Sequence, residues 1–173
     1  MEVILAQGDE KTGKTELCKK IVKLLTFYNF IAIEEEETNS FGDFLGIYEH
    51  KDCKTIIIIN SGSDDNDIIK LFEGFYKKHT SKSVCDILIS AIRPKSVNRN
   101  LNKYIKDIYK DDFEAEEYIV DLDAEKMKKE KEELDFCEFI DKILKERGTE
   151  ILKKIKKELK CKIEFDCEPK YEK

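Results

Sequence analysis

Four consecutive isoleucines, Ile56 to Ile59, form the feature that most restricts the fold of this chain. A strand with β-branched residues at every position, and no alternation with polar side chains, is typical of a sheet buried on both faces. A second unbroken apolar run, Ile87 to Ile89, follows, and the residues 64–79 between the two runs have helical periodicity. The pattern predicts a doubly wound α/β fold, with a mainly parallel sheet between two layers of helices.

Strand-like and helix-like segments alternate along most of the chain. The segment 41–54 contains two glycines and fits either a short hairpin or a helix that carries a loop, so it stays unassigned. The predicted strands are 3–6, 30–33, 55–60, 86–92 and 117–122, and the predicted helices are 14–28, 64–79, 97–109, 124–146 and 150–160.

Length and hydropathy favour one soluble domain. A chain of 173 residues has the usual size of a single domain and can bury a substantial core. We interpret residues 1–173 as one domain, in which 124–173 form a mainly helical extension packed on the rest. The chain has no apolar run of about 18 residues, and its N-terminus lacks a basic segment ahead of an apolar one. We therefore expect a cytoplasmic protein that binds no membrane.

The charges and cysteines exclude several kinds of site. With 38 acidic and 32 basic residues the net charge is −6, so affinity for nucleic acid is not expected. The lysine pairs at 153–154 and 156–157 are expected to be solvated. The six cysteines include no C-x-x-C pair, and the chain has only two histidines, His50 and His79. A zinc site or a disulfide framework is therefore not expected, and the cysteines should be reduced.

One motif bears directly on chemistry. It matches G-x-x-x-x-G-K-[ST], the Walker A or P-loop pattern, and consists of Gly8, Asp9, Glu10, Lys11, Thr12, Gly13, Lys14 and Thr15. A predicted strand leads into it and a predicted helix begins at Lys14, so loop N–H groups can converge on a phosphate. Lys14 would reach the β- and γ-phosphates, and the Thr15 hydroxyl would hold Mg²⁺. The alternative is a glycine-containing turn with a surface lysine.

Over about residues 1–122 this motif and the alternation of elements resemble the P-loop NTPase superfamily. The loop is similar to those of thymidylate kinase-like proteins, which also tolerate an acidic residue at the place of Asp9 or Glu10. The resemblance implies binding of ATP or GTP with Mg²⁺, followed by hydrolysis or by phosphoryl transfer to an acceptor that the sequence does not identify. The guanine-reading pattern N-K-x-D is absent, since residues 102–105 read Asn-Lys-Tyr-Ile.

The superfamily's second signature is an acidic residue that ends an apolar strand and holds the Mg²⁺ shell. Asn60 occupies this place after the isoleucine run. An amide can orient a metal-bound water but brings no charge, so we expect either Asp64 or a carboxylate among Glu34 to Glu37 to substitute, or hydrolysis to be weak. The departure favours kinase-like proteins over motor ATPases.

Arginine is scarce in this chain, and two of the three arginines, Arg93 and Arg99, follow the strand that ends at Ile92. P-loop kinases place phosphate-clamping arginines in the corresponding region, and the planar guanidinium suits that role. The resemblance therefore implies that Lys14, Arg93 and Arg99 act on the transferred phosphate. The alternative is a pair of surface cations beside a helix start.

Two other functions stay open. Residues 85–96 also resemble the strand-and-proline segment of chromosome-partitioning (ParA-like) ATPases, although those proteins carry a further lysine where this chain has Asp9. This resemblance implies a nucleotide-dependent switch with slow hydrolysis that binds a protein partner or forms a homodimer. The last alternative is a degenerate P-loop that binds no nucleotide.

Overall fold

The computed structural model describes residues 1–38, 42–81, 84–97, 99–110, 115–122 and 136–159. They form an α/β structure around a six-stranded sheet with the strand order β2-β3-β4-β5-β1-β6. The strands are β1 (Glu2–Gln7), β2 (Phe30–Glu37), β3 (Phe44–His50), β4 (Ile56–Asn60), β5 (Ile87–Ile92) and β6 (Glu116–Asp121).

The sheet is mixed. Strands β4, β5, β1 and β6 pair in parallel, whereas β2 pairs antiparallel with β3 and β3 pairs antiparallel with β4. The α/β class is thus confirmed, and the parallel part of the sheet holds all the strands that were expected to be buried on both faces. The antiparallel pairs lie at one edge, where β2 is the last strand.

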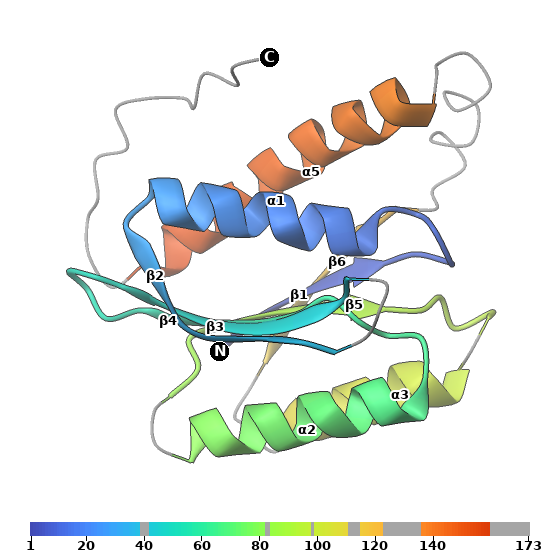
Figure 1. Ribbon diagram of the computed structural model, residues 1–173, viewed down its shortest axis with the longest axis horizontal. Helices are drawn as coiled ribbons and strands as arrows, with labels where there is room; N and C mark the ends of the chain where they lie inside the picture. Colours follow the sequence, from blue (N-terminus) through green and yellow to red (C-terminus); the bar gives the residue numbers. More distant parts are fainter. Residues whose placement is uncertain (39–41, 82–83, 98, 111–114, 123–135, 160–173) are drawn as a thin grey trace.

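Helices cover both faces of the sheet (Figure 1). Helices α1 (Lys14–Phe27) and α5 (Phe136–Glu158) lie on one face, and α2 (Asn66–Thr80) and α3 (Arg99–Tyr109) lie on the other. Each layer has its own buried cluster: Ile57 and Ile59 pack with α1 and α5, whereas Ile58 packs with α2 and α3. The unbroken isoleucine run is explained by this arrangement, because successive residues of a strand face opposite sides.

Most predicted elements agree with the structure to within two residues at each end, but three differ. Strand β2 continues to Glu37, beyond the predicted end at Ile33. The unassigned segment 41–54 contains β3, which forms an antiparallel hairpin with β2. Over the described residues 42–54 the segment therefore supplies one strand, and neither a separate short hairpin nor a helix is observed there.

The C-terminal helices form the third difference. The predicted break between residues 146 and 150 is wrong, because α5 runs through it without interruption. Gly148 lies within this stretch and packs toward α1, where an added Cβ would lie 3.8 Å from Leu24 Cδ1. The predicted helical stretch 124–135 lies outside the described residues.

Lys154 also differs from the sequence expectation of a solvated lysine. Its ammonium is 2.7 Å from the Glu2 carboxylate, which is only 7% exposed, and 4.1 Å from the centre of the Tyr118 ring. Lys153, Lys156 and Lys157 are exposed as predicted. Within the described residues, no helix has the length and apolar character needed to cross a membrane.

Candidate functional site

The Walker A residues lie at the edge of the sheet where the parallel strands have their carboxyl ends, a usual place for ligand sites in α/β proteins. Strand β1 ends at Gln7, and α1 begins at Lys14. Two backbone hydrogen bonds fix the start of the loop between its neighbours. Gly8 N donates to Ile92 O of β5 at 3.2 Å, and Leu122 N, just after β6, donates to Gln7 O at 2.8 Å.

Both glycines of the motif are required by the loop's geometry. Gly13, which caps α1, has φ 91° and ψ 16°, a left-handed conformation that favours glycine. At Gly8 an added Cβ would lie 2.3 Å from Thr12 Oγ1, so a side chain there would collide with the loop. The Thr12 hydroxyl in turn donates to Asp9 O at 2.9 Å and closes the turn. The loop is thus compact before any ligand is considered.

Lys14 points back into this loop. Its ammonium donates to Gly8 O at 3.0 Å and to Asp9 O at 2.7 Å, and the residue is 7% exposed. A cation at the N-terminus of a 14-residue helix adds to the positive end of the helix dipole, so this place attracts an anion. Electrostatically the loop is therefore suited to a phosphate group.

The neighbouring Thr15 contacts a carboxylate that sequence reasoning missed. Its hydroxyl donates to Asp43 Oδ1, and Asp43 is 6% exposed. Asp43 lies directly before β3, and two hydrogen bonds hold it near the end of β4: Phe44 N donates to Ser61 Oγ at 2.8 Å, and Ser61 N donates to Phe44 O at 3.0 Å. The only available signal was an aspartate within the unassigned segment 41–54.

Asn60, at the predicted second-signature position, is fully buried and bonded to other groups. Its Nδ2 donates to Ser90 Oγ at 3.0 Å, and its Oδ1 accepts from Gly62 N at 3.2 Å. The amide therefore connects β4 to β5 and to the turn that follows. Asp64, the other predicted metal residue, accepts from Arg93 Nε at 3.0 Å and lines the cavity above the loop.

The glutamates of β2 lie apart from Thr15. Glu34 pairs with Lys78 and lies 3.3 Å from His79 Nε2, and the hydrogen bond from Lys78 lowers the pKa of Glu34. Glu35 accepts a hydrogen bond from the Tyr48 hydroxyl at 2.5 Å. These groups connect β2 to α2 and β3, so the structure gives no support to their substitution for the second-signature carboxylate.

The two predicted arginines are differently situated. Arg93 is brought into the site: its Nη1 is 2.8 Å from Asp9 Oδ1 and its Nη2 is 3.7 Å from Glu10 Oε1. Arg99 is the first residue of α3, and its side chain is not among those described. The structure thus places Arg93 at the Walker A loop, and the role of Arg99 stays a prediction.

A cavity of about 380 Å³ opens over the loop, and it is lined by residues 11–16 together with Asp43, Ser61 and Asp64. The Thr15 hydroxyl and the Asp43 carboxylate are hard oxygen donors of the kind that Mg²⁺ accepts. Among the described residues, no group of three or more His, Cys, Asp or Glu could hold a metal alone. The donor set therefore fits an Mg²⁺ ion that takes its other ligands from phosphate and water.

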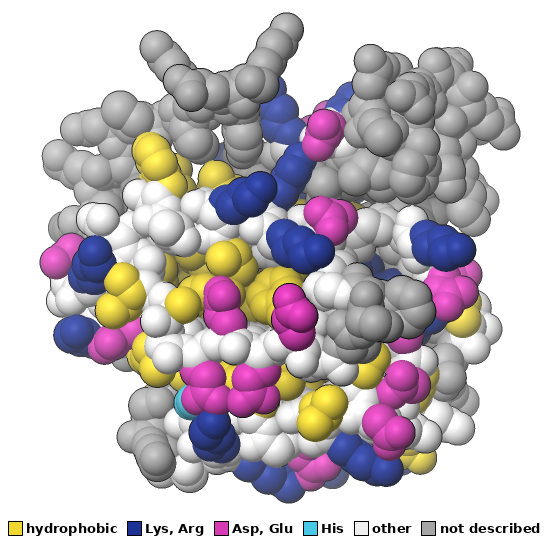
Figure 2. Space-filling model, viewed as in Figure 1, with side chains coloured by type: hydrophobic (Ala, Val, Ile, Leu, Met, Phe, Trp, Pro, Cys, Tyr) yellow, Lys and Arg dark blue, Asp and Glu magenta, His cyan; other side chains and the backbone are white. Residues whose placement is uncertain are grey.

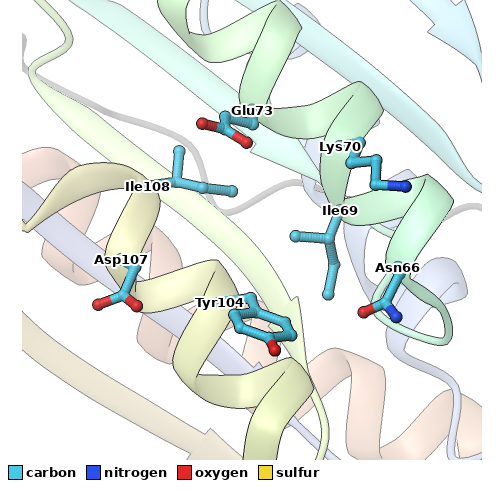
Figure 3. Close-up of a pocket in the computed structure, with 7 residues that line it drawn as sticks. All are labelled: Asn66, Ile69, Lys70, Glu73, Tyr104, Asp107 and Ile108. Atoms are coloured by element: carbon cyan, nitrogen blue, oxygen red, sulfur yellow. The ribbon is translucent and has the colours of Figure 1, made fainter.

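Two further cavities lie elsewhere. One, of about 390 Å³, lies between α2 and α3 and includes Lys70, Glu73 and Tyr104 (Figure 3). The other, of about 580 Å³, lies between α1 and the β2–β3 hairpin. Figure 2 shows that face, with cationic side chains over α1, anionic ones over the hairpin and apolar atoms exposed between them. Neither is lined by the glycines or the lysine of the Walker A motif.

Comparisons of the chain with protein-family models, with curated proteins and with solved structures find no match. The proposal of a function therefore depends on the geometry and chemistry of the site itself.

Proposed function

We propose that this protein is a doubly wound P-loop protein that binds a nucleoside triphosphate, ATP or GTP, together with Mg²⁺. The observation that carries the proposal is the juxtaposition of three groups at one cavity. These are the buried Lys14 ammonium within the Walker A loop, the Thr15 hydroxyl beside it, and the Asp43 carboxylate that accepts the hydroxyl's hydrogen bond.

Lys14 is the group that would meet the phosphate charge. Two loop carbonyls accept hydrogen bonds from its ammonium. A phosphate group carries a net negative charge spread over its oxygens, so it attracts the ammonium more strongly than the dipoles of neutral carbonyls do. The expected event on binding is that Lys14 exchanges these carbonyls for the β- and γ-phosphates, while the N–H groups of the loop donate to the same anion.

Thr15 and Asp43 are the residues that would hold the cation. A bound Mg²⁺ would neutralise charge that develops on the phosphates during transfer. Because Thr15 donates its proton to Asp43, its oxygen keeps lone pairs for the cation. With these groups the site supports NTP hydrolysis or phosphoryl transfer to an acceptor, although no described residue is identified as a catalytic base.

A nucleotide-dependent switch is the second candidate function, and one observation favours it. The guanidinium of Arg93 already pairs with Asp9 and Asp64, so in this form it is engaged by carboxylates and does not act as an open phosphate clamp. A site without such a clamp would hydrolyse slowly, as expected of a switch that binds a protein partner or a second copy of the chain.

Nucleotide binding is tested by thermal unfolding with and without MgATP and MgGTP. A ligand that binds only the folded state stabilises it by RT ln(1 + [L]/Kd), about 2.7 kcal/mol at a hundredfold excess over Kd, so Tm should rise. Lys14→Ala should abolish the rise, and EDTA should reduce it. Lys70→Ala, in the cavity between α2 and α3, is the control and should keep the wild-type response.

Because Lys14 is buried, circular dichroism should accompany the melts to show that Lys14→Ala is folded. If none of the four common NTPs changes the Tm of the wild-type protein at millimolar concentration, the Walker A loop is degenerate and the proposal is wrong.

A further inference from the structure

Arg93 has an unusually well-fixed backbone next to the Walker A loop. It follows the last residue of β5, Ile92, whose carbonyl accepts a hydrogen bond from Gly8 N. Its own carbonyl accepts a hydrogen bond at 2.9 Å from Asn102 Nδ2 of α3, and Asn102 is 2% exposed. The start of the side chain is therefore held from the loop on one side and from α3 on the other.

The guanidinium then connects two separate loops. Its Nε is 3.0 Å from Asp64 Oδ1, in the turn between β4 and α2, and its Nη1 is 2.8 Å from Asp9 Oδ1, in the Walker A loop. The arginine side chain is only 10% exposed, whereas Asp9 and Asp64 are 52% and 41% exposed, so burial orders the guanidinium while water still reaches both carboxylates. The rigid fork of arginine suits such a double contact, whereas lysine offers only a point charge.

We propose that Arg93 is a positioning residue, which ties the Walker A loop to the β4–α2 turn and so keeps the loop in its phosphate-cradling conformation. The inference rests on the proposed function, and it differs from the role of a phosphate clamp. It also explains the carboxylate of Asp9 in an anion-binding loop, because that carboxylate is the group by which Arg93 holds the loop.

Two substitutions distinguish a positioning role of Arg93 from a phosphate-binding role, because they change the local charge in opposite directions. Arg93→Gln removes a positive charge and Asp64→Asn removes a negative one, but both break the connection between the loops. If Arg93 positions the loop, both variants should weaken MgATP binding, by about tenfold, the scale found when a residue that orients ligand-binding groups is removed. If Arg93 binds phosphate, Asp64→Asn removes one of the carboxylates that compete for the guanidinium and should leave MgATP affinity unchanged or increase it.

The first measurement is hydrogen exchange of residues 8–13, followed by mass spectrometry, in protein free of nucleotide and metal. Arg93→Gln, Asp64→Asn and Asp9→Asn should each accelerate exchange in this loop and leave the central strands unchanged. Because no metal is present, a loss of metal binding in Asp64→Asn cannot contribute to the difference in exchange between the variants. Arg147→Gln is the matched control, because Arg147 pairs with Glu150 on α5 at 2.9 Å, away from the loop.

The second measurement is MgATP affinity beside turnover for the same variants. A positioning role predicts a higher Kd or KM for Arg93→Gln with a smaller change in kcat, and partial recovery in Arg93→Lys. Unchanged loop exchange in Arg93→Gln, or unchanged or tighter MgATP binding by Asp64→Asn, would overturn the inference. If Arg93→Gln does not fold, Asp64→Asn and Asp9→Asn still test it. If the wild-type protein binds no nucleotide, the proposed function is wrong. The exchange experiment still tests whether Arg93 holds the Walker A loop to the β4–α2 turn, because it uses no nucleotide.

Discussion

The Thr15 hydroxyl is the smallest group on which the proposed chemistry depends. A hydroxyl has one proton to donate and two lone pairs to offer. Asp43 accepts the hydrogen bond from this hydroxyl and thereby orients its oxygen. A threonine without this partner could turn its proton toward a cation, which would oppose binding. Under the proposed function the carboxylate would act on Mg²⁺ in two ways, through its own charge and through the orientation of the Thr15 hydroxyl.

We expect Asp43→Asn to abolish most of the Mg²⁺ dependence of nucleotide binding. Wild-type protein should bind ATP more tightly with Mg²⁺ than with EDTA, and the variant should lose about tenfold or more of that difference, because an amide carries no charge and can donate a proton toward the cation. Titration of a fluorescent nucleotide with and without Mg²⁺ measures the effect.

Asp67→Asn, on the exposed first turn of α2, is the control for the loss of one negative charge. If Asp43→Asn keeps the full Mg²⁺ dependence, the metal carboxylate lies elsewhere, and Asp64 is the next candidate.

The Walker A residues could be predicted one by one because their pattern is contiguous in the sequence. Asp43 could not, since its contact with Thr15 spans 28 positions and depends on how the β2–β3 hairpin folds back along β4. The partners of Arg93 were missed for the same reason: Asp9 is 84 positions away. Asn60 was found at the expected place, but its hydrogen bonds to β5 and to the following turn are visible only in the structure.

At the scale of elements, β3 shows why local patterns can be insufficient. Gly46 lies inside this strand and suggested a loop, yet the Tyr48 side chain occupies the space beside it. An added Cβ at Gly46 would lie 2.6 Å from the Tyr48 hydroxyl oxygen. Burial and the hydrogen bond to Glu35 raise the pKa of Tyr48, so the phenol stays protonated and keeps this bond at ordinary pH. Gly46 therefore makes room for the contact between Tyr48 of β3 and Glu35 of β2. A glycine in the sequence does not indicate such a contact.

Gly46→Ala should lower the free energy of unfolding by about 1–3 kcal/mol, the usual cost of overpacking. Gly74→Ala is the matched control: Gly74 lies within α2 with no neighbour within 4 Å of its added Cβ, so the change should stabilise the protein by about 0.5–1 kcal/mol. Urea denaturation of the two variants and wild type measures both effects. Equal stability of Gly46→Ala and wild type would show that Tyr48 moves aside freely.

At the scale of the whole molecule, α5 connects the end of the described chain to its beginning. Lys154 of α5 pairs with the buried Glu2 of β1 and lies over the ring of Tyr118 in β6. The strand order could not be derived from the sequence, because β1 lies between β5 and β6 only through pairings that are distant along the chain. The contacts of Lys154 depend on this strand order, because they join residues of β1 and β6. The sequence could therefore predict an amphipathic helix but not the ion pair that holds it to β1.

Lys154→Met should lower the free energy of unfolding by about 1–2 kcal/mol, because it leaves the Glu2 carboxylate buried without its charged partner. Lys153→Met, at the adjacent exposed position, is the control and should stay within about 0.5 kcal/mol of wild type. Urea denaturation at neutral pH compares the two. Similar stabilities of both variants would mean that α5 is held by its apolar face alone.

The β2–β3 hairpin at the rim of the sheet divides the site into two modules. The phosphate-facing loop belongs to the parallel strands in the interior, whereas the acid nearest Thr15 is contributed by an antiparallel unit on the periphery. Asp43 stands in the loop before β3, and loops tolerate substitution and insertion better than the buried strands that they connect. Under the proposed function, changes confined to this loop should therefore alter the preference for the cation while phosphate recognition by the Walker A loop persists.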